Sequence, residues 1–336
     1  MIRARLSGLG MYVPEQVVTN DDLAALMDTD DEWIHKRTGI RERRYAPEGV
    51  ATSEIAVPAA DAAIRDAGLT PSDIDFILFA TLSPDHHFPG ASCYFQAQMG
   101  LEGVPAMDLR TQCTGFLYGL ATATAFVRSG LYRHVLVVGA EVHSHAMDFS
   151  SAGRDITVLF GDGAGAAVVS ASAEGEPSEL KTFHLHADGR YADALAFKVW
   201  DIRRKPFIQH EGQVGVTQPD ERWPSMNGRE VFRHAVIGMR AAVLEACAAN
   251  ALSVGDIDLL VPHQANMRIN ESVAKGLGID ENRVIHTIQR YGNTTAASIP
   301  MALCAAREEG RLMRGQRIVL VAFGSGFTWG SAYLVY

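Results

Sequence analysis

The stretch Asp108-Leu109-Arg110-Thr111-Gln112-Cys113-Thr114-Gly115-Phe116 marks the point where a predicted strand passes into a predicted helix. Apolar residues within 104–109 indicate a buried strand, and the small apolar residues from Phe116 onward indicate a buried helix. Cys113 stands between them, at the helix start. Free backbone N–H groups and the helix dipole favour a thiolate there, although a lone cysteine is more commonly a core residue. Cys113 is therefore a candidate nucleophile that needs support from the rest of the chain.

A repeat at an offset of 183 residues (317 minus 134) relates the two halves of the chain. The matching segments are 72–77 with 255–260, and 134–139 with 317–322. Predicted alanine-rich helices at 55–67 and 231–249 precede the first pair. Because predicted strands alternate with predicted helices, the pattern indicates sheets covered by helices. We therefore expect an α/β fold of two similar halves, residues 1–172 and residues 173–336, joined near residues 170–178.

Two polar residues of the second half also stand at the ends of predicted apolar elements, as Cys113 does between its strand and its helix. His263 follows the predicted strand 259–262, and Asn293 precedes the predicted helix 296–306. Ligands gather at the carboxyl ends of strands in such folds, so the three side chains form a candidate Cys-His-Asn set for covalent acyl chemistry. Taken singly, His263 is as well explained by a structural hydrogen bond and Asn293 by a turn or N-cap.

Composition limits the classes of function. The 336 residues suffice for about two domains, and 47% of them are hydrophobic. A net charge of −9 argues against nucleic acid or an anionic membrane as a partner. The sequence shows neither the apolar run of a signal peptide nor that of a membrane span, and its four cysteines form no CxxC pair. We therefore expect a cytoplasmic protein without a structural metal.

Three further stretches have plain structural interpretations. The charged residues within 31–44 are typical of a solvated surface. The glycine-rich segment 161–165 fits neither the Walker nor the dinucleotide fingerprint, and it is predicted to be a turn between strands at 157–160 and 166–169. The paired histidines at 86–87 and 143–145 lack the other ligands of a metal site, so we place them in surface loops.

Four motifs resemble the beta-ketoacyl-acyl-carrier-protein synthase III family of the thiolase superfamily. They are Gln112-Cys113-Thr114-Gly115-Phe116, Val261-Pro262-His263-Gln264-Ala265-Asn266, Gly292-Asn293-Thr294-Thr295-Ala296-Ala297-Ser298 and Gly324-Ser325-Gly326-Phe327-Thr328-Trp329-Gly330. Segments 31–34, 37–40 and 160–165 match as well, and the resemblance runs almost end to end, being weakest over 191–224. It implies a thiolase-like, duplicated αβαβα five-layer fold and a homodimer.

The resemblance implies a reaction and a role for each motif. Cys113 would take an acyl group from an acyl-CoA, which is a substrate, so that no cofactor is needed. His263 and Asn293 would bind the thioester carbonyl of a malonyl group on acyl carrier protein while it loses carbon dioxide. The backbone N–H groups of Cys113 and Ser325 would form an oxyanion hole. A neutral imidazole and an amide are suitable donors to the developing oxyanion.

The resemblance also assigns binding positions around this centre. Those implied for coenzyme A are Trp33, Arg37, Thr38, Arg154, Phe232 and Asn266. Arg233 and Arg268 match basic positions that meet the acidic carrier protein. Phe88 matches a residue that crosses the dimer into the partner's acyl pocket, where a bulky side chain favours a short acyl group.

The sequence departs from the family in ways that leave the acyl donor open. Arg229 replaces an asparagine, Asp155 replaces a glycine, and the segment 191–224 is longer and carries Trp200 and Trp223. Segments 81–87 and 110–113 also resemble the anthraniloyl-CoA-using synthase of quinolone signal production. The alternative is therefore a condensing enzyme of specialised metabolism that uses a medium-chain or aromatic acyl-CoA. A non-catalytic partner subunit is disfavoured, because the Cys-His-Asn set is retained.

Overall fold

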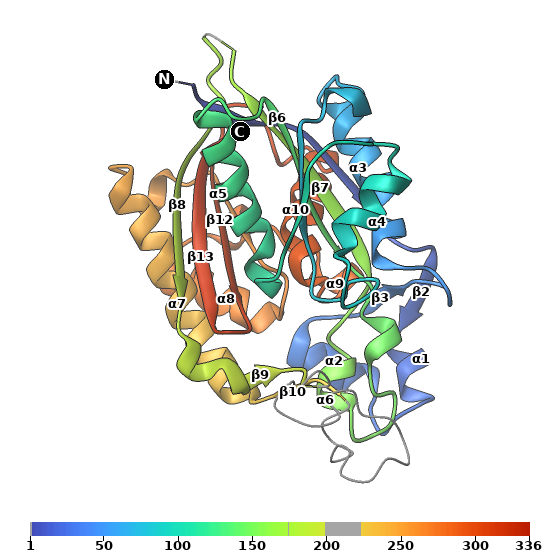
Figure 1. Ribbon diagram of the computed structural model, residues 1–336. Coiled ribbons are helices and arrows are strands. Elements are labelled where there is room, and N and C mark those ends of the chain that lie inside the picture. The colour runs from blue at the N-terminus through green and yellow to red at the C-terminus, as the bar shows by residue number, and fades with distance from the viewer. Residues whose placement is uncertain (1, 174, 199–222) are drawn as a thin grey trace.

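The computed structural model describes residues 2–173, 175–198 and 223–336, and its elements stack in five layers (Figure 1). Two sheets alternate with three layers of helices, so the predicted αβαβα arrangement is confirmed. Trp200 lies outside the described residues.

The first sheet is built from the N-terminal part of the chain. In spatial order its strands are β1 (Ala4–Tyr12), β7 (Gly163–Ala171), β6 (His134–Glu141), β4 (Phe76–Ala80) and β5 (Ala106–Leu109). Strand β4, between β6 and the edge strand β5, is parallel to both of its neighbours, and all of its residues are buried. Strands buried on both faces are continuous apolar runs, which is why this strand was evident in the sequence.

The second sheet is built from the C-terminal part of the chain. Its order is β11 (Leu259–Pro262), β12 (Arg317–Gly324), β13 (Thr328–Val335) and β8 (Glu179–Ala187). Strands β11 and β12 are parallel, whereas β13 is antiparallel to both of its neighbours. The strands of the first sheet thus lie within residues 4–171, and those of the second lie within residues 179–335. The division of the chain into halves between residues 172 and 173 stays a prediction.

Helices fill the space between the sheets and cover their outer faces (Figure 1). The helices of these layers are α3 (Thr52–Asp66), α4 (Ala91–Gln98), α5 (Gly115–Arg128), α7 (Gly228–Ala249), α8 (Met267–Leu277) and α10 (Ser298–Glu308). The α5 and α10 helices form the middle layer and contact strands of both sheets. The α3 and α4 helices cover the first sheet, and α7 and α8 cover the second. The position of α5 and α10 between the two sheets, where most of their residues are buried, explains their small, apolar composition.

The 183-residue repeat is visible in the element boundaries. Strands β6 and β12 begin and end at equivalent positions, and α5 and α10 begin at equivalent positions, Gly115 and Ser298. Each of these helices is preceded by a short 3-10 turn, Gln112–Thr114 or Thr295–Ala297. The first residue of each turn has a positive φ, 47° at Gln112 and 48° at Thr295. The two halves therefore share even their unusual backbone conformation.

Smaller elements gather at the end of the sheets where α5 begins, at the bottom of Figure 1. They are β2 (Gln16–Thr19), α1 (Asn20–Ala24), α2 (Asp31–Thr38), β3 (Glu42–Tyr45), α6 (Arg154–Thr157), β9 (Leu195–Ala196), β10 (Ser225–Met226) and α9 (Ile288–Tyr291). These elements surround the carboxyl ends of the parallel strands, where ligands are expected in this class of fold.

Three local predictions are wrong, each because distant segments cover the residues concerned. The segment 157–160 is not a strand, since α6 ends at Thr157 and Phe160 forms only an isolated bridge to Asn293. Arg43, predicted to be solvated, is completely buried and donates to the carbonyls of Val18 and Val158 and to Asn20 Oδ1. His143, predicted to lie in a surface loop, is 2% exposed.

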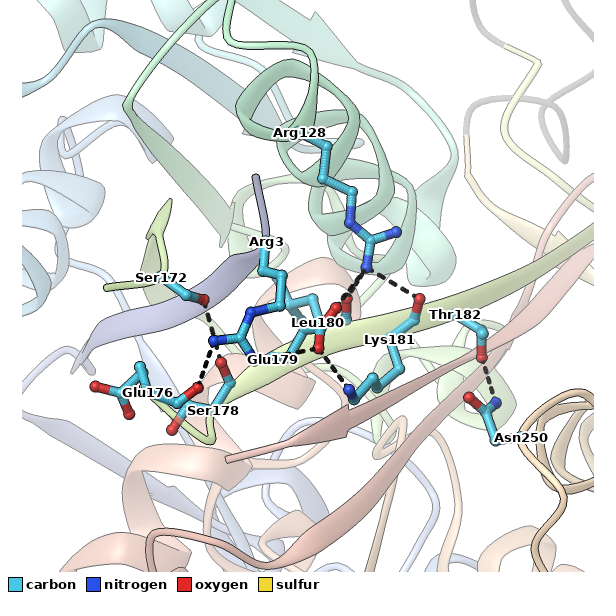
Figure 2. Close-up of polar contacts among 10 residues, drawn as sticks. All are labelled: Arg3, Arg128, Ser172, Glu176, Ser178, Glu179, Leu180, Lys181, Thr182 and Asn250. Atoms are coloured by element: carbon cyan, nitrogen blue, oxygen red, sulfur yellow. Dashed lines mark hydrogen bonds and ion pairs between the residues drawn. The ribbon is translucent and has the colours of Figure 1, made fainter. Parts of the chain in front are cut away.

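A cluster of charges joins the two sheets at the end opposite these small elements (Figure 2). Glu179, at the start of β8, has a side chain only 11% exposed and lies near Arg3, Arg128 and Lys181. Its carboxylate oxygens lie 3.8 Å, 3.4 Å and 2.5 Å from the nearest nitrogens of these three side chains. Arg128, in the last turn of α5, also donates to the Leu180 carbonyl at 2.5 Å. One carboxylate thus links the N-terminal segment and the middle helix layer to the second sheet.

We expect Glu179→Gln to lower the free energy of unfolding by about 1.5–3 kcal/mol, because it removes the charge that three partly buried cations share. Urea unfolding measures this change. The matched control is Glu309→Gln, whose exposed pair with Arg290 (3.1 Å) should contribute no more than about 1 kcal/mol. Equal effects of the two substitutions would contradict a special role for Glu179.

Candidate active site

A cavity of about 2190 Å³ opens at the carboxyl ends of the strands and is lined by residues of both halves. Ordinary small-molecule pockets measure about 300–1,000 Å³, so this cavity suits a long substrate. Cys113, His263 and Asn293 all line it. The tertiary structure therefore brings together three residues that are up to 180 positions apart in the sequence (293 minus 113).

Cys113 is held in the 3-10 turn between β5 and α5, as the sequence predicted. Its side chain is 8% exposed, and the backbone N–H groups of Cys113 and Ser325 each lower the pKa of its thiol. The loop that carries Ser325 approaches very closely: a Cβ atom on Gly324 would lie 2.9 Å from the Cys113 Cβ. Glycine is therefore required at position 324 for the second N–H group to reach the sulfur.

The resting state of Cys113 differs from the simple expectation of a thiolate. Burial raises the pKa of the Cys113 thiol to about 12, and the Glu141 carboxylate acts in the same direction. The two backbone N–H groups lower the pKa but do not outweigh burial. Cys113 is therefore a thiol at neutral pH, and its proton must leave as the sulfur reacts.

His263 directly follows β11 and is 2% exposed. Its Nδ1 lies 2.7 Å from the Ser298 hydroxyl oxygen, whereas its Nε2 is buried and has no hydrogen-bond partner within the described residues. Ser298 Oγ accepts the backbone N–H of Gln264 at 3.4 Å, which leaves its own proton to donate to Nδ1. When the Ser298 hydroxyl donates to Nδ1, the ring proton lies on Nε2, where it is available to a substrate oxygen.

Burial also fixes the charge of this histidine. It lowers the pKa of His263 to about 3, so the ring is neutral over the physiological range. A neutral imidazole with a free Nε2–H is a hydrogen-bond donor of the kind that stabilises an oxyanion. It is poorly suited to hold a positive charge, because burial disfavours the charged form.

Asn293 lies in the turn between α9 and α10 and is 6% exposed. Its Oδ1 accepts the backbone N–H of Thr295 at 2.9 Å, and no hydrogen bond within the described chain uses its Nδ2 group. The preceding Gly292 has φ 62° and ψ −158°, a conformation essentially restricted to glycine. The backbone thus turns the amide so that a donor group remains available beside His263.

Gln264 is a supporting residue to which sequence reasoning assigned no role. It is 1% exposed, and its Nε2 donates to the carbonyls of Pro262 and Ile285 while its Oε1 accepts two backbone N–H groups. Those two N–H groups belong to Thr287 and Ile288, at the start of α9. Its side chain therefore ties the strand that presents His263 to the segment that leads to Asn293.

Glu141 is a second supporting residue that the sequence did not indicate. It is completely buried at the end of β6 and accepts hydrogen bonds from Thr81, Leu82 and Ser83. Leu82 and Ser83 line the cavity, so Glu141 holds one of its walls. Burial raises the pKa of Glu141 to about 7 in spite of these hydrogen bonds.

Of the positions expected around adenine, Trp33 and Arg37 line the cavity, whereas Arg154 is absent from the described lining residues and lies over the Trp33 ring. The guanidinium carbons of Arg37 and Arg154 lie 4.3 Å and 5.0 Å from the Trp33 ring centroid. A base between Trp33 and Arg154 needs two contacts of about 3.5 Å each, or about 7 Å in total. Arg154, which is also paired with Asp28 at 3.5 Å, must therefore move before a base can enter.

The other predicted binding positions differ in their availability. Phe232, Arg268, Thr38 and Asn266 line the cavity, and the Arg268 guanidinium lies 5.9 Å from the Phe232 ring. The Thr38 hydroxyl donates to the Ile34 carbonyl, and Asn266 caps α8. Both therefore shape the entrance through internal hydrogen bonds.

Arg233 and Phe88 are absent from the described residues that line the cavity. Arg233 is exposed on α7. The Phe88 side chain is 79% exposed, which is unusual for an isolated phenylalanine. Arg229 and Asp155, which differ from the residues expected in the family, both line the cavity, so they can affect which substrate the cavity accepts.

Within the described ranges, no group of three or more His, Cys, Asp or Glu residues could hold a metal ion. In the same part of the chain, every helix is too short or too polar to cross a membrane.

The five layers and the buried cysteine beside an imidazole and an amide define a thiolase-like condensing acyltransferase. The family model for 3-oxoacyl-[acyl-carrier-protein] synthase III matches residues 107–189, and the model for its C-terminal part matches residues 247–336. The chain therefore belongs to the 3-oxoacyl-[acyl-carrier-protein] synthase III family.

Similar proteins extend this match to the whole chain. The beta-ketoacyl-[acyl-carrier-protein] synthase III of Rhodospirillum rubrum is 47% identical over 337 residues, covering 99% of both chains. The crystal structure of the synthase III from Aquifex aeolicus is 39% identical, with a TM-score of 0.88 over 99% of this chain and 100% of that one. That from Pseudomonas aeruginosa is 38% identical, also with a TM-score of 0.88, over 99% and 98%.

We expect the rings of His263 and His143 to stay neutral down to about pH 5, because burial lowers the pKa of each to about 3. In the unfolded state each ring has the ordinary histidine pKa of 6.5 and takes up a proton below that pH, whereas in the folded state it does not. The free energy of unfolding therefore decreases as the pH falls below 6.5. NMR of protein labelled in its histidine rings measures the charge, with signals assigned from His263→Gln and His143→Gln. A titration of either ring near pH 6.5 would contradict the neutral, buried state.

Proposed function

We propose that this protein catalyses the decarboxylative Claisen condensation of an acyl-CoA with malonyl-acyl carrier protein, the first condensation of fatty acid biosynthesis. The products are a 3-oxoacyl-acyl carrier protein, carbon dioxide and free coenzyme A. One observation carries the proposal: a buried cysteine in contact with the Gly324 backbone lines the same cavity as an imidazole and an amide whose donor groups have no hydrogen-bond partner among the described residues. The family membership and the names of the relatives support the same reaction.

The first step transfers the acyl group to Cys113. The sulfur attacks the thioester carbonyl, the bond from that carbon to the coenzyme A sulfur breaks, and the thiol proton passes to the departing sulfur. The oxygen gains negative charge in the tetrahedral intermediate, and the N–H groups of Cys113 and Ser325 are the donors that would bind it. Removing a single donor of this kind typically slows a reaction by about 10²–10³-fold.

The second step forms the new carbon–carbon bond. His263 Nε2–H and Asn293 Nδ2–H bind the thioester oxygen of the malonyl group, and the electrons of the breaking bond to carbon dioxide form an enolate. The enolate carbon attacks the acyl carbonyl, and the Cys113 sulfur leaves and regains a proton. No base has to remove a proton from carbon, which agrees with the low pKa of His263.

The two substrates are expected to use one entrance. Coenzyme A would bind with its adenine between Trp33 and Arg154 and its pantetheine arm along Phe232. The carrier protein is acidic, and Arg233 and Arg268 are exposed cations at or beside the entrance. Because the whole chain carries a net charge of −9, such a local basic surface is needed to attract an acidic partner.

A homodimer is the expected assembly. Strand β5 is an edge strand of the first sheet, and Met107 on it is 38% exposed. Phe88, 79% exposed, would be covered by a second copy and would reach into the partner's acyl pocket. The alternative of a specialised-metabolite synthase is not favoured by the relatives, which are named as synthase III enzymes.

Mass spectrometry of the intact protein separates the two steps. With an acyl-CoA, we expect Cys113→Ala to form no acyl adduct, whereas His263→Ala and Asn293→Ala should form it at a near-normal rate. Adding malonyl-acyl carrier protein should then reveal a loss of condensation of about 10²–10³-fold in the last two variants. Cys247→Ala is the matched control, since Cys247 is also buried but lies outside the cavity. An adduct on Cys113→Ala would exclude the proposed nucleophile.

We expect Arg233→Glu and Arg268→Glu each to raise the KM for malonyl-acyl carrier protein about tenfold, because charge reversal weakens attraction to an acidic partner. Steady-state kinetics at two salt concentrations measures the effect, which should shrink at high salt. Arg290→Glu is a control at an exposed arginine outside the cavity. An unchanged KM in both variants would place the docking surface elsewhere.

A further inference from the structure

The glycine loop that approaches Cys113 is attached to a second segment, residues 188–196. The Ser325 hydroxyl donates a hydrogen bond to the backbone carbonyl of Leu195, in β9. Two backbone hydrogen bonds run in opposite directions between Asp188 and Phe327, at 2.8 Å and 2.9 Å. In Figure 1, β9 and β10 lie just below the turn that joins β12 to β13.

Side chains strengthen the same attachment. The Tyr191 and Phe327 rings stack with their centroids 5.3 Å apart and an interplanar angle of 9°. His234, from α7, lies 4.3 Å from the Tyr191 ring centroid. Aromatic stacking of this kind adds to the stabilisation that burial alone supplies, so Phe327 anchors one end of the loop.

Strand β9 is also a wall of the cavity. Leu195 and Ala196 line the cavity together with Met226, which pairs with Leu195 in the β9–β10 ladder. The backbone N–H of Asn227 donates to the Ala194 carbonyl at 2.7 Å and continues this pairing. The Leu195 carbonyl therefore belongs to a two-stranded ladder that lines the cavity.

Ser325 has a special place in the loop because it lies between two glycines. Gly324 has no side chain at the contact with Cys113, and Gly326 has φ 135°, which side chains rarely allow. Gly324 still pairs with Thr328 at the end of the β12–β13 ladder, but the glycine that follows Ser325 has no side chain to help fix the direction of the intervening N–H group. The Ser325 carbonyl accepts from Thr328 Oγ1 at 3.2 Å, and its hydroxyl is the remaining anchor.

We propose that Ser325 is a positioning residue whose hydroxyl, held by the Leu195 carbonyl, aims the backbone N–H of Ser325 at the Cys113 sulfur. The β9–β10 ladder is thereby coupled to the proposed oxyanion hole. This inference rests on the proposed function for its role in acyl transfer, but the aim of the N–H group is a property of the protein without substrate. Loss of the hydroxyl leaves the N–H group in place but less well directed.

Alkylation of Cys113 by iodoacetamide as a function of pH, followed by the mass of the peptide that carries Cys113, tests the aim directly, because the exposed Cys93 also reacts and would obscure the mass of the intact protein. The N–H group of Ser325 lowers the pKa of the Cys113 thiol, so Ser325→Ala should slow alkylation at pH 8 several-fold and shift the profile to higher pH. Ser325→Thr keeps the hydroxyl and should restore the wild-type profile. Ser331→Ala is the matched control, because Ser331 likewise donates to a backbone carbonyl, that of Ala242 at 2.7 Å, but lies outside the cavity.

Acyl transfer gives the second measurement. In Ser325→Ala, kcat for adduct formation should fall about tenfold, less than the 10²–10³-fold for complete loss of a donor, with KM for acyl-CoA within about twofold. Tyr191→Leu removes the ring that stacks on Phe327, so it weakens the attachment of the loop without changing the loop itself. It should shift the alkylation profile of Cys113 in the same direction. This variant keeps the inference testable if Ser325→Ala fails to fold. A wild-type alkylation profile in both variants would overturn the inference. Failure of the proposed function would appear separately, as an acyl adduct on Cys113→Ala.

Discussion

The contact between the Gly324 backbone and Cys113 is the constraint on which the rest of the site depends. A Cβ atom at position 324 would lie 2.9 Å from the Cys113 Cβ, so the two loops touch without a side chain between them. That contact lets a backbone N–H group from the second half reach a sulfur from the first. Backbone donors held in this way need no reorganisation when charge develops on a substrate, which is the physical basis of an oxyanion hole.

The internal repeat explains how one cavity receives different chemistry from two similar halves. At the 183-residue offset, Ala80 corresponds to His263, and Cys113 corresponds to Ala296. Each half therefore carries a small residue where the other carries a functional one. The pseudo-equivalent strand ends meet at a single cavity, so substitutions in either copy can add to one site. The repeat brings equivalent strand ends to one cavity. Because the two copies differ in sequence at these positions, they have different proposed roles.

Burial keeps the site uncharged in its resting state. It raises the pKa of Cys113 to about 12 and lowers that of His263 to about 3, so at neutral pH one is a thiol and the other a neutral imidazole. Hydrogen bonds are electrostatically stronger in such surroundings, but an unpartnered polar group is costly. Supporting residues limit this cost, because the side chains of Gln264 and Glu141 each form several hydrogen bonds with polar groups of the loops around the cavity.

The sequence by itself determined the duplicated α/β fold, since buried strands and helices leave apolar periodicities that local residues carry. It also singled out Cys113, His263 and Asn293 as candidates, and their motifs indicated the family. Only the tertiary structure decided that Arg43 is buried, that His263 Nε2 has no hydrogen-bond partner among the described residues and that the Ser325 hydroxyl donates to the Leu195 carbonyl. The reason is physical: burial and hydrogen bonding depend on segments that are distant in the sequence. Arg43 binds a carbonyl 115 residues away, and Ser325 one 130 residues away.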